Sequence, residues 1–134
     1  MIVYKELEFH KGYIVNLYLN NNWYAYTNDR ESLFRGIENS LDCYAAYDDK
    51  KLVGLIRTIG DGETIVYIQD ILVMEKYHRQ KIGTTLMNYI LDKYKNVRQI
   101  CLMTDLEESQ RKFYESCGFI DYKTAKAVGY LRKK

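Results

Sequence analysis

The first feature of this chain that could bind or react with a ligand is a polar loop that leads into a helix. The loop spans residues 75–81, follows the apolar segment 71–73, and leads into a helix that starts near Gly83. The first backbone N–H groups of a helix have no partner inside the helix, and the helix dipole favours an anion there. Such a junction binds phosphate through its backbone, and Arg79 and Lys81 add positive charge. A plain solvated connection has the same appearance, so the loop alone does not define a function.

One carboxylate lies where the sequence is otherwise apolar. Asp70 falls in the second half of a strand pattern that covers residues 64–74. An ionisable group in such a position is usually paired or functional. Two roles are therefore open for Asp70: a general base, or a structural carboxylate bonded to a backbone group or a tyrosine hydroxyl. Simple alternation along the strand predicts that Tyr67 and Gln69 lie on the face opposite to Asp70.

Changes in hydrophobic period divide the chain into elements. Helical spacing predicts about four helices: residues 10–20, a segment that runs from a cap at Asn28 or Asp29 to Leu41, a helix after the polar loop, and residues 107–117. Period-two and β-branched segments predict six or seven strands: 1–7, 43–47, 52–59, 64–74, 97–103, 119–123 and 127–131. This order predicts a mixed α/β sheet with helices on its faces.

Length and composition restrict the class of protein. The 134 residues, 47% hydrophobic and 28% charged, fit a single domain over residues 1–134. A formal net charge of +2 and no basic stripe argue against a nucleic-acid partner, and no apolar stretch is long enough to span a membrane. The N-terminus has no signal-peptide pattern, so we expect a cytoplasmic protein. The cysteines and histidines have no ligand spacing, so we expect no metal.

Two motifs together resemble the GNAT superfamily of acyltransferases. The family has an apolar strand followed by a Gln/Arg-x-x-Gly-x-Gly/Ala loop, and this chain has Ile71-Leu72-Val73 followed by His78-Arg79-Gln80-Lys81-Ile82-Gly83. Phe113-Tyr114-Glu115-Ser116-Cys117-Gly118-Phe119 is similar to the family motif Phe-Tyr-x-x-x-Gly-Phe. The resemblance covers about residues 43–122. It implies a GNAT-like mixed, mostly antiparallel sheet of six to seven strands flanked by about four helices.

The resemblance also implies a cosubstrate, acetyl-CoA, and residues that bind it. The backbone of Ile71, Leu72 and Val73 would pair with the pantetheine arm as if it were an added strand. The pyrophosphate would be held by backbone N–H groups of the loop and the first helical turn: Arg79, Gln80, Lys81, Ile82, Gly83 and Thr84. Tyr114 would be the general acid that protonates the leaving CoA thiolate. The alternative for Tyr114 is one more packed aromatic side chain.

Two loop positions depart from the family pattern. His78 stands where Gln or Arg is usual, and Lys81 stands where the family has its first glycine. Glycine lets the backbone approach the pyrophosphate closely, and lysine suits the loop if its φ is negative. Because the backbone donors remain, we expect acetyl-CoA binding to survive both changes.

The expected activity is transfer of an acetyl group from acetyl-CoA to a primary amine, with a small molecule favoured as the acceptor over a protein amine. An aromatic cluster, Trp23, Tyr24 and Tyr26, would receive an apolar or aromatic amine, although core packing explains it equally well. The alternative function is a non-catalytic acyl-CoA-binding sensor or partner protein of the same fold. We expect no nucleic-acid or membrane partner, and a homodimer remains open.

Overall fold

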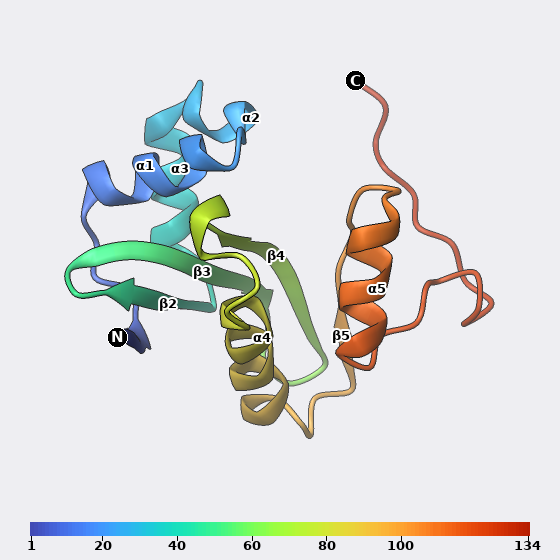
Figure 1. The fold of residues 1–134 in the computed structure, drawn as a ribbon. Helices are drawn as coiled ribbons and strands as arrows, with labels where there is room; N and C mark the ends of the chain where they lie inside the picture. The colour runs from blue at the N-terminus through green and yellow to red at the C-terminus, as the bar shows by residue number, and fades with distance from the viewer. The chain divides into compact units, whose positions relative to one another are not determined.

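The computed structural model describes residues 1–134 (Figure 1). Contacts within the chain divide it into two compact units, Met1–Met103 and Thr104–Lys134. The first unit holds the sheet and the helices that cover it, and the second holds the last helix and the C-terminal segment. None of the helices combines the length and apolar character needed to cross a membrane. A single domain over residues 1–134 stays a prediction.

The sheet of the first unit is mixed and mostly antiparallel, as predicted. Its five strands lie in chain order: β1 (Ile2–Glu6), β2 (Asp42–Asp48), β3 (Lys51–Gly60), β4 (Ile65–Val73) and β5 (Gln99–Cys101). Neighbours run antiparallel except β4 and β5, which run parallel. The turn from β3 to β4 needs glycine, because Gly60 has a φ of 135° and a Cβ there would lie 2.4 Å from the carbonyl oxygen of Ile65.

Helices cover both faces of this sheet. Three helices lie over one face, α1 (Lys11–Asn20), α2 (Tyr24–Thr27) and α3 (Arg30–Glu38), and α4 (Ile82–Lys93) lies over the other (Figure 1). Asp29 begins α3, because its carboxylate accepts a hydrogen bond from the N–H of Ser32 at 3.2 Å. A short 3₁₀ helix, η1 (Glu75–Tyr77), lies between β4 and α4. The core consists of apolar side chains from the helices and the central strands, among them Ile14, Leu17, Leu55, Ile56, Leu86 and Ile90.

The second unit corrects the predicted strand number. It contains α5 (Glu108–Ser116), which ends before Gly118 at a φ of 94°. The strands expected at 119–123 and 127–131 are absent, because local turns use the backbone groups that a ladder would need. Asp121 accepts the N–H of Thr124 at 2.7 Å through its side chain, and the carbonyl of Tyr122 accepts the N–H of Ala127 at 2.7 Å. The fold therefore has five strands rather than six or seven, and five α-helices where about four were predicted.

Candidate active site

A β-bulge interrupts β4 in its middle. Arg57 on β3 lies opposite Asp70, whereas Thr58 lies opposite Ile68, so Gln69 has no partner on β3. An extra residue of this kind bends the strand and disrupts the ladder locally. Bulges occur often beside active sites. The expected alternation along β4 is therefore broken at Gln69.

The bulge corrects the predicted faces of β4. Directly opposed residues point to the same side of a sheet, so Asp70 shares a face with Arg57. Tyr67 lies opposite Ile59, which is two positions from Arg57 and therefore on the same face. Tyr67 and Asp70 share one face of the sheet, contrary to the prediction. A count along the sequence cannot detect this change, because it depends on the partner strand.

Beyond the bulge, β4 has a free outer edge. The strand β5 pairs only with residues 65–67 of β4. Ile71 and Leu72 are paired with β3 on one side and have no strand on the other. An edge of this kind can accept an extended chain as an added strand. At its end, Nε2 of His78 lies 2.9 Å from the carbonyl oxygen of Val73 and must donate to it, so His78 ties the loop to the strand.

The loop before α4 does not meet the condition under which lysine suits position 81. The φ of Lys81 is +61°, not negative, so lysine takes the left-handed conformation in which glycine is unstrained. Arg79 also has a positive φ of 68°, and Gln80 between them does not. Residues with positive φ in such a loop turn backbone N–H groups toward one concave side, which suits an anion. No side chain caps α4, whose first residues are Ile82, Gly83 and Thr84, so their N–H groups have no partner within the helix.

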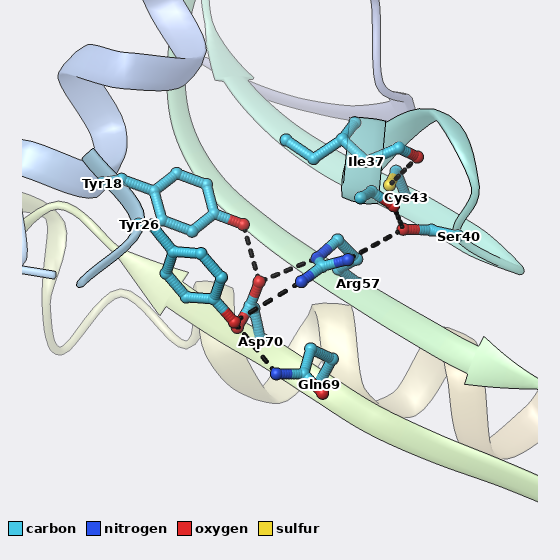
Figure 2. A network of polar contacts seen from close by, with 9 residues as sticks. Tyr18, Tyr26, Ile37, Ser40, Cys43, Arg57, Gln69 and Asp70 are labelled. Atoms are coloured by element: carbon cyan, nitrogen blue, oxygen red, sulfur yellow. Dashed lines mark hydrogen bonds and ion pairs between the residues drawn. The ribbon is translucent and has the colours of Figure 1, made fainter. Parts of the chain in front are cut away.

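A buried carboxylate is the centre of a hydrogen-bond network on the α1–α3 face (Figure 2). Asp70 is 2% exposed. Its Oδ2 accepts the Nε–H of Arg57 at 2.8 Å and the hydroxyl of Tyr18 at 2.8 Å. Its Oδ1 accepts the hydroxyl of Tyr26 at 2.7 Å. Every buried polar side-chain atom of the protein has a hydrogen-bond partner, so the network is complete.

Charge and burial within this network keep Arg57 ionised and Tyr18 neutral. Burial lowers the pKa of Arg57, but the ion pair with Asp70 outweighs burial and raises it overall. Burial, followed by the charge of Asp70, raises the pKa of Tyr18 well above its usual value. A phenol in this state donates its hydrogen to the carboxylate at every physiological pH.

These contacts bear on the two roles left open for Asp70. A general base needs a lone pair that the substrate proton can reach. Asp70 is buried and already accepts three hydrogen bonds, two of them from tyrosine hydroxyls, which is the structural alternative. Its action as the base stays a prediction.

The network reaches the surface through Tyr26 and Gln69. The hydroxyl oxygen of Tyr26 accepts from Nε2 of Gln69 at 3.0 Å and from Nη2 of Arg57 at 3.4 Å. The side chain of Gln69 is exposed and that of Tyr26 is half-buried. Tyr26 packs edge-on against Tyr18 with ring centroids 5.2 Å apart, and Trp23 lies 6.0 Å from Tyr26. Two of the three aromatic residues predicted as a cluster therefore lie together, while Tyr24 is 53% exposed.

Tyr114 belongs to the second unit, on α5. Its ring contacts Phe113 and Phe119 edge-on, with centroid distances of 5.1 Å and 6.1 Å. Burial raises the pKa of Tyr114 and a hydrogen bond with the side chain of Thr104 lowers it, with a net rise. The phenol is therefore protonated at neutral pH and can donate a hydrogen, as an acid must. The role of Tyr114 as general acid stays a prediction.

The chain has an open cavity elsewhere in the first unit. It has a volume of about 500 Å³ and is lined by Glu6, Leu7, Phe9, Ile37, Glu38 and Cys43. None of these is a predicted site residue. No group of three or more His, Cys, Asp or Glu side chains is arranged to hold a metal ion. The free edge of β4 and the bare end of α4, rather than this cavity, form the candidate site.

The family model for the acetyltransferase (GNAT) domain matches residues 5–131. The chain belongs to the GNAT acetyltransferase family. The resemblance carried by the two motifs is confirmed, and it extends from residues 43–122 to nearly the whole chain. The GNAT fold therefore includes the N-terminal helices, which the motifs did not cover.

Solved structures of GNAT proteins match the fold. A GNAT-family acetyltransferase of Streptococcus pneumoniae is 35% identical, with 100% of this chain and 98% of that chain covered and a TM-score of 0.89. A probable acetyltransferase of meticillin-resistant Staphylococcus aureus is 26% identical, with 99% and 100% covered and a TM-score of 0.81. The PaiA N-acetyltransferase of Thermoplasma acidophilum, in complex with coenzyme A, is 17% identical, with 87% and 88% covered and a TM-score of 0.69; it shows the fold alone. A comparison with curated proteins finds no match.

Proposed function

We propose that this GNAT protein transfers the acetyl group of acetyl-CoA to the primary amine of a small molecule. The observation that carries the proposal is the free outer edge of β4, which leads through the loop to the uncapped N-terminus of α4. The amide groups of a pantetheine arm suit the first feature, because they pair like a peptide strand. A pyrophosphate suits the uncapped N-terminus of α4, because its oxygens accept hydrogen bonds from backbone N–H groups that have no partner within the helix. The Thermoplasma structure in complex with coenzyme A supports the cosubstrate.

Each group of residues then has one task. Ile71, Leu72 and Val73 bind the pantetheine arm through their backbone, and the pyrophosphate is bound by backbone N–H groups of Arg79, Gln80, Lys81, Ile82, Gly83 and Thr84. The neutral amine attacks the thioester carbonyl carbon, forming a C–N bond and a tetrahedral intermediate. The C–S bond then breaks, Tyr114 protonates the leaving thiolate, and the nitrogen loses one proton to a base or to water.

Acetyl-CoA should raise the melting temperature of the protein, because it binds the folded state only. A ligand at a hundred times its dissociation constant stabilises by about 2.7 kcal/mol. For a domain of this size that corresponds to a shift of roughly 5–10 °C. Differential scanning fluorimetry measures the shift, with ATP as the control that supplies phosphates without a pantetheine arm. The absence of a shift at millimolar acetyl-CoA would contradict the proposal.

A screen of primary amines with acetyl-CoA tests the transfer itself. Released thiol is measured with alkyl amines, aryl amines, polyamines, amino acids and a lysine peptide. We expect thiol release with at least one small amine. Acetyl-CoA binding without thiol release from any amine would support the non-catalytic acyl-CoA-binding alternative instead.

The loop gives a prediction about its backbone. Lys81→Gly should keep acetyl-CoA binding within about threefold, because the backbone donors carry the contact. It should also be more stable than the control Lys81→Ala by about 1 kcal/mol, since only glycine takes the left-handed conformation without a penalty. Both variants remove the ammonium group, so their difference isolates the backbone. Loss of binding in both would mean that the Lys81 side chain is a principal phosphate ligand.

A further inference from the structure

The buried carboxylate fixes the direction of every hydrogen bond between Asp70 and the surface. A carboxylate that forms an ion pair only accepts hydrogen bonds, and Asp70 pairs with Arg57 at 2.8 Å. The hydroxyl of Tyr26 has one hydrogen, and it lies 2.7 Å from Oδ1 of Asp70, so that hydrogen points inward. The phenolic oxygen of Tyr26 can therefore only accept from its other neighbours.

The next group outward is the amide of Gln69. The amide lies 3.0 Å from the hydroxyl oxygen of Tyr26. Because Tyr26 only accepts there, the NH₂ end of the amide must face Tyr26, and the carbonyl oxygen Oε1 must face away from it. Figure 2 shows this chain of contacts from Asp70 through Tyr26 to Gln69. The carbonyl oxygen of the exposed Gln69 makes no hydrogen bond within the protein, so it is an outward-facing acceptor of fixed orientation.

The charge behind this acceptor is balanced. Arg57 and Asp70 form a buried ion pair at 2.8 Å, so one positive and one negative charge cancel beneath Tyr26. Gln69 thus offers a neutral carbonyl and not a carboxylate. A neutral carbonyl accepts one N–H of an uncharged amine and leaves the nitrogen lone pair free to attack. A carboxylate would stabilise the ammonium form, whose lone pair already holds a proton.

The position of Gln69 on β4 suits an acceptor amine. Under the proposed function the pyrophosphate lies at the loop after Val73, so the pantetheine arm runs back along β4 and its thioester end points toward the bulge. Gln69 is the bulged residue, two positions before Ile71, where the pairing of β4 with β5 has ended. The thioester and the Gln69 carbonyl are thereby brought to the same part of the strand.

We propose that Gln69 binds the acceptor as an uncharged primary amine through its side-chain carbonyl, and that Tyr26 is the positioning residue that orients this amide. The proposal rests on the proposed function and adds the residue that recognises the amine. Tyr26 acts only through Gln69, and the Asp70–Arg57 pair sets the direction of the hydrogen bond that Tyr26 donates.

The test measures steady-state acetyl transfer in Gln69→Ala and Tyr26→Phe, with Tyr13→Phe on the neighbouring helix α1 as the matched control. Butylamine and phenethylamine are the probes, because each is small enough to reach Gln69 whatever larger acceptor the protein prefers. Loss of one neutral hydrogen bond predicts a fall in kcat/KM for the amine of about three- to tenfold in both variants. The KM for acetyl-CoA should not change, and Tyr13→Phe should behave as the wild type, since Tyr13 is 43% exposed and its ring stacks on His10, outside the candidate site.

Gln69→Glu gives a second readout that a purely structural residue would not move. The new carboxylate should hold the amine as ammonium, so kcat/KM at neutral pH should fall at least tenfold. It should recover as the pH rises toward the pKa of the free amine. An unchanged kcat/KM in Gln69→Ala, or an equal change in the KM for acetyl-CoA, would overturn the proposal. Gln69 is exposed, so these variants should fold even if Tyr26→Phe proves unstable.

The acetyl-CoA melting shift separates this proposal from the proposed function. A wild-type protein without the shift would contradict the function itself. A wild-type protein that shows the shift but acetylates neither butylamine nor phenethylamine at high concentration would overturn the amine-binding role of Gln69 and leave acetyl-CoA binding standing.

Discussion

Tyr114→Phe should lower the turnover number of acetyl transfer by about 10²–10⁴-fold, the usual contribution of general-acid assistance. Phenylalanine keeps the ring and its edge-on packing against Phe113 and Phe119 but has no proton to give to the thiolate. Turnover should not vanish, because a thiolate is a fair leaving group even without protonation. The affinity for acetyl-CoA and the melting temperature should stay nearly unchanged.

The control for this experiment is Tyr130→Phe, which removes a hydroxyl from a tyrosine that is 91% exposed in the same unit. Turnover and melting temperature are measured on the same preparations under conditions where chemistry limits the rate. If Tyr114 is only a packed aromatic residue, turnover will be normal, or its loss will follow a loss of stability from the hydrogen bond with Thr104. Normal turnover in a stable Tyr114→Phe protein would contradict its assignment as the acid.

The features that the sequence predicted well are those that depend on neighbours along the chain. The apolar run Ile71–Val73, the polar loop and the following helix lie within about fifteen residues, so spacing alone predicts a strand, a loop and a helix N-terminus. Asp29 as a helix cap is equally local, since its partner is Ser32. The hairpin strands β2 and β3 follow from alternation and turn residues.

The features that it missed depend on partners far along the chain. Tyr18 and Tyr26 reach Asp70 across 52 and 44 positions, and no local pattern joins them. The bulge at Gln69 exists only in the pairing of β4 with β3. One signal was present: Arg57 and Asp70 are both charged within apolar strands, one on each side of the turn at 60–63. A regular hairpin register would place Arg57 opposite Gln69, next to Asp70, and the bulge completes the pairing of Arg57 with Asp70.

The prediction of two strands in the C-terminal segment was wrong for a related reason. Apolar residues at 119–123 and 127–131 have strand propensity, but propensity describes fitness for a paired surface and supplies no partner strand. Asp121 competes for the backbone of the same segment and forms a turn instead. The positive φ of Lys81 was not predicted, because lysine itself rarely takes the left-handed conformation, and the only sign of it was the glycine of the family pattern at this position.

Asp70→Asn should destabilise the protein by about 3–5 kcal/mol, because it leaves the buried charge of Arg57 without its partner. Arg57 is 6% exposed, so water cannot replace the lost carboxylate, and the amide must also disrupt a bond with Tyr18 or Tyr26. For a domain of this size the melting temperature should fall by roughly 10–20 °C. The matched control is Asp92→Asn, an exposed aspartate on α4, which should melt close to the wild type.

The same variant decides between the two roles of Asp70. A general base can be replaced by asparagine with loss of turnover and little change in stability, whereas the central carboxylate of the network cannot. The pair Arg57→Met with Asp70→Leu sharpens the test, because it removes both charges at once. If the ion pair is structural, the double variant should be markedly more stable than the sum of its single changes predicts, because each single change leaves a lone buried charge and the double variant leaves none. An Asp70→Asn protein that melts like the wild type but has lost its turnover would show instead that Asp70 is the base.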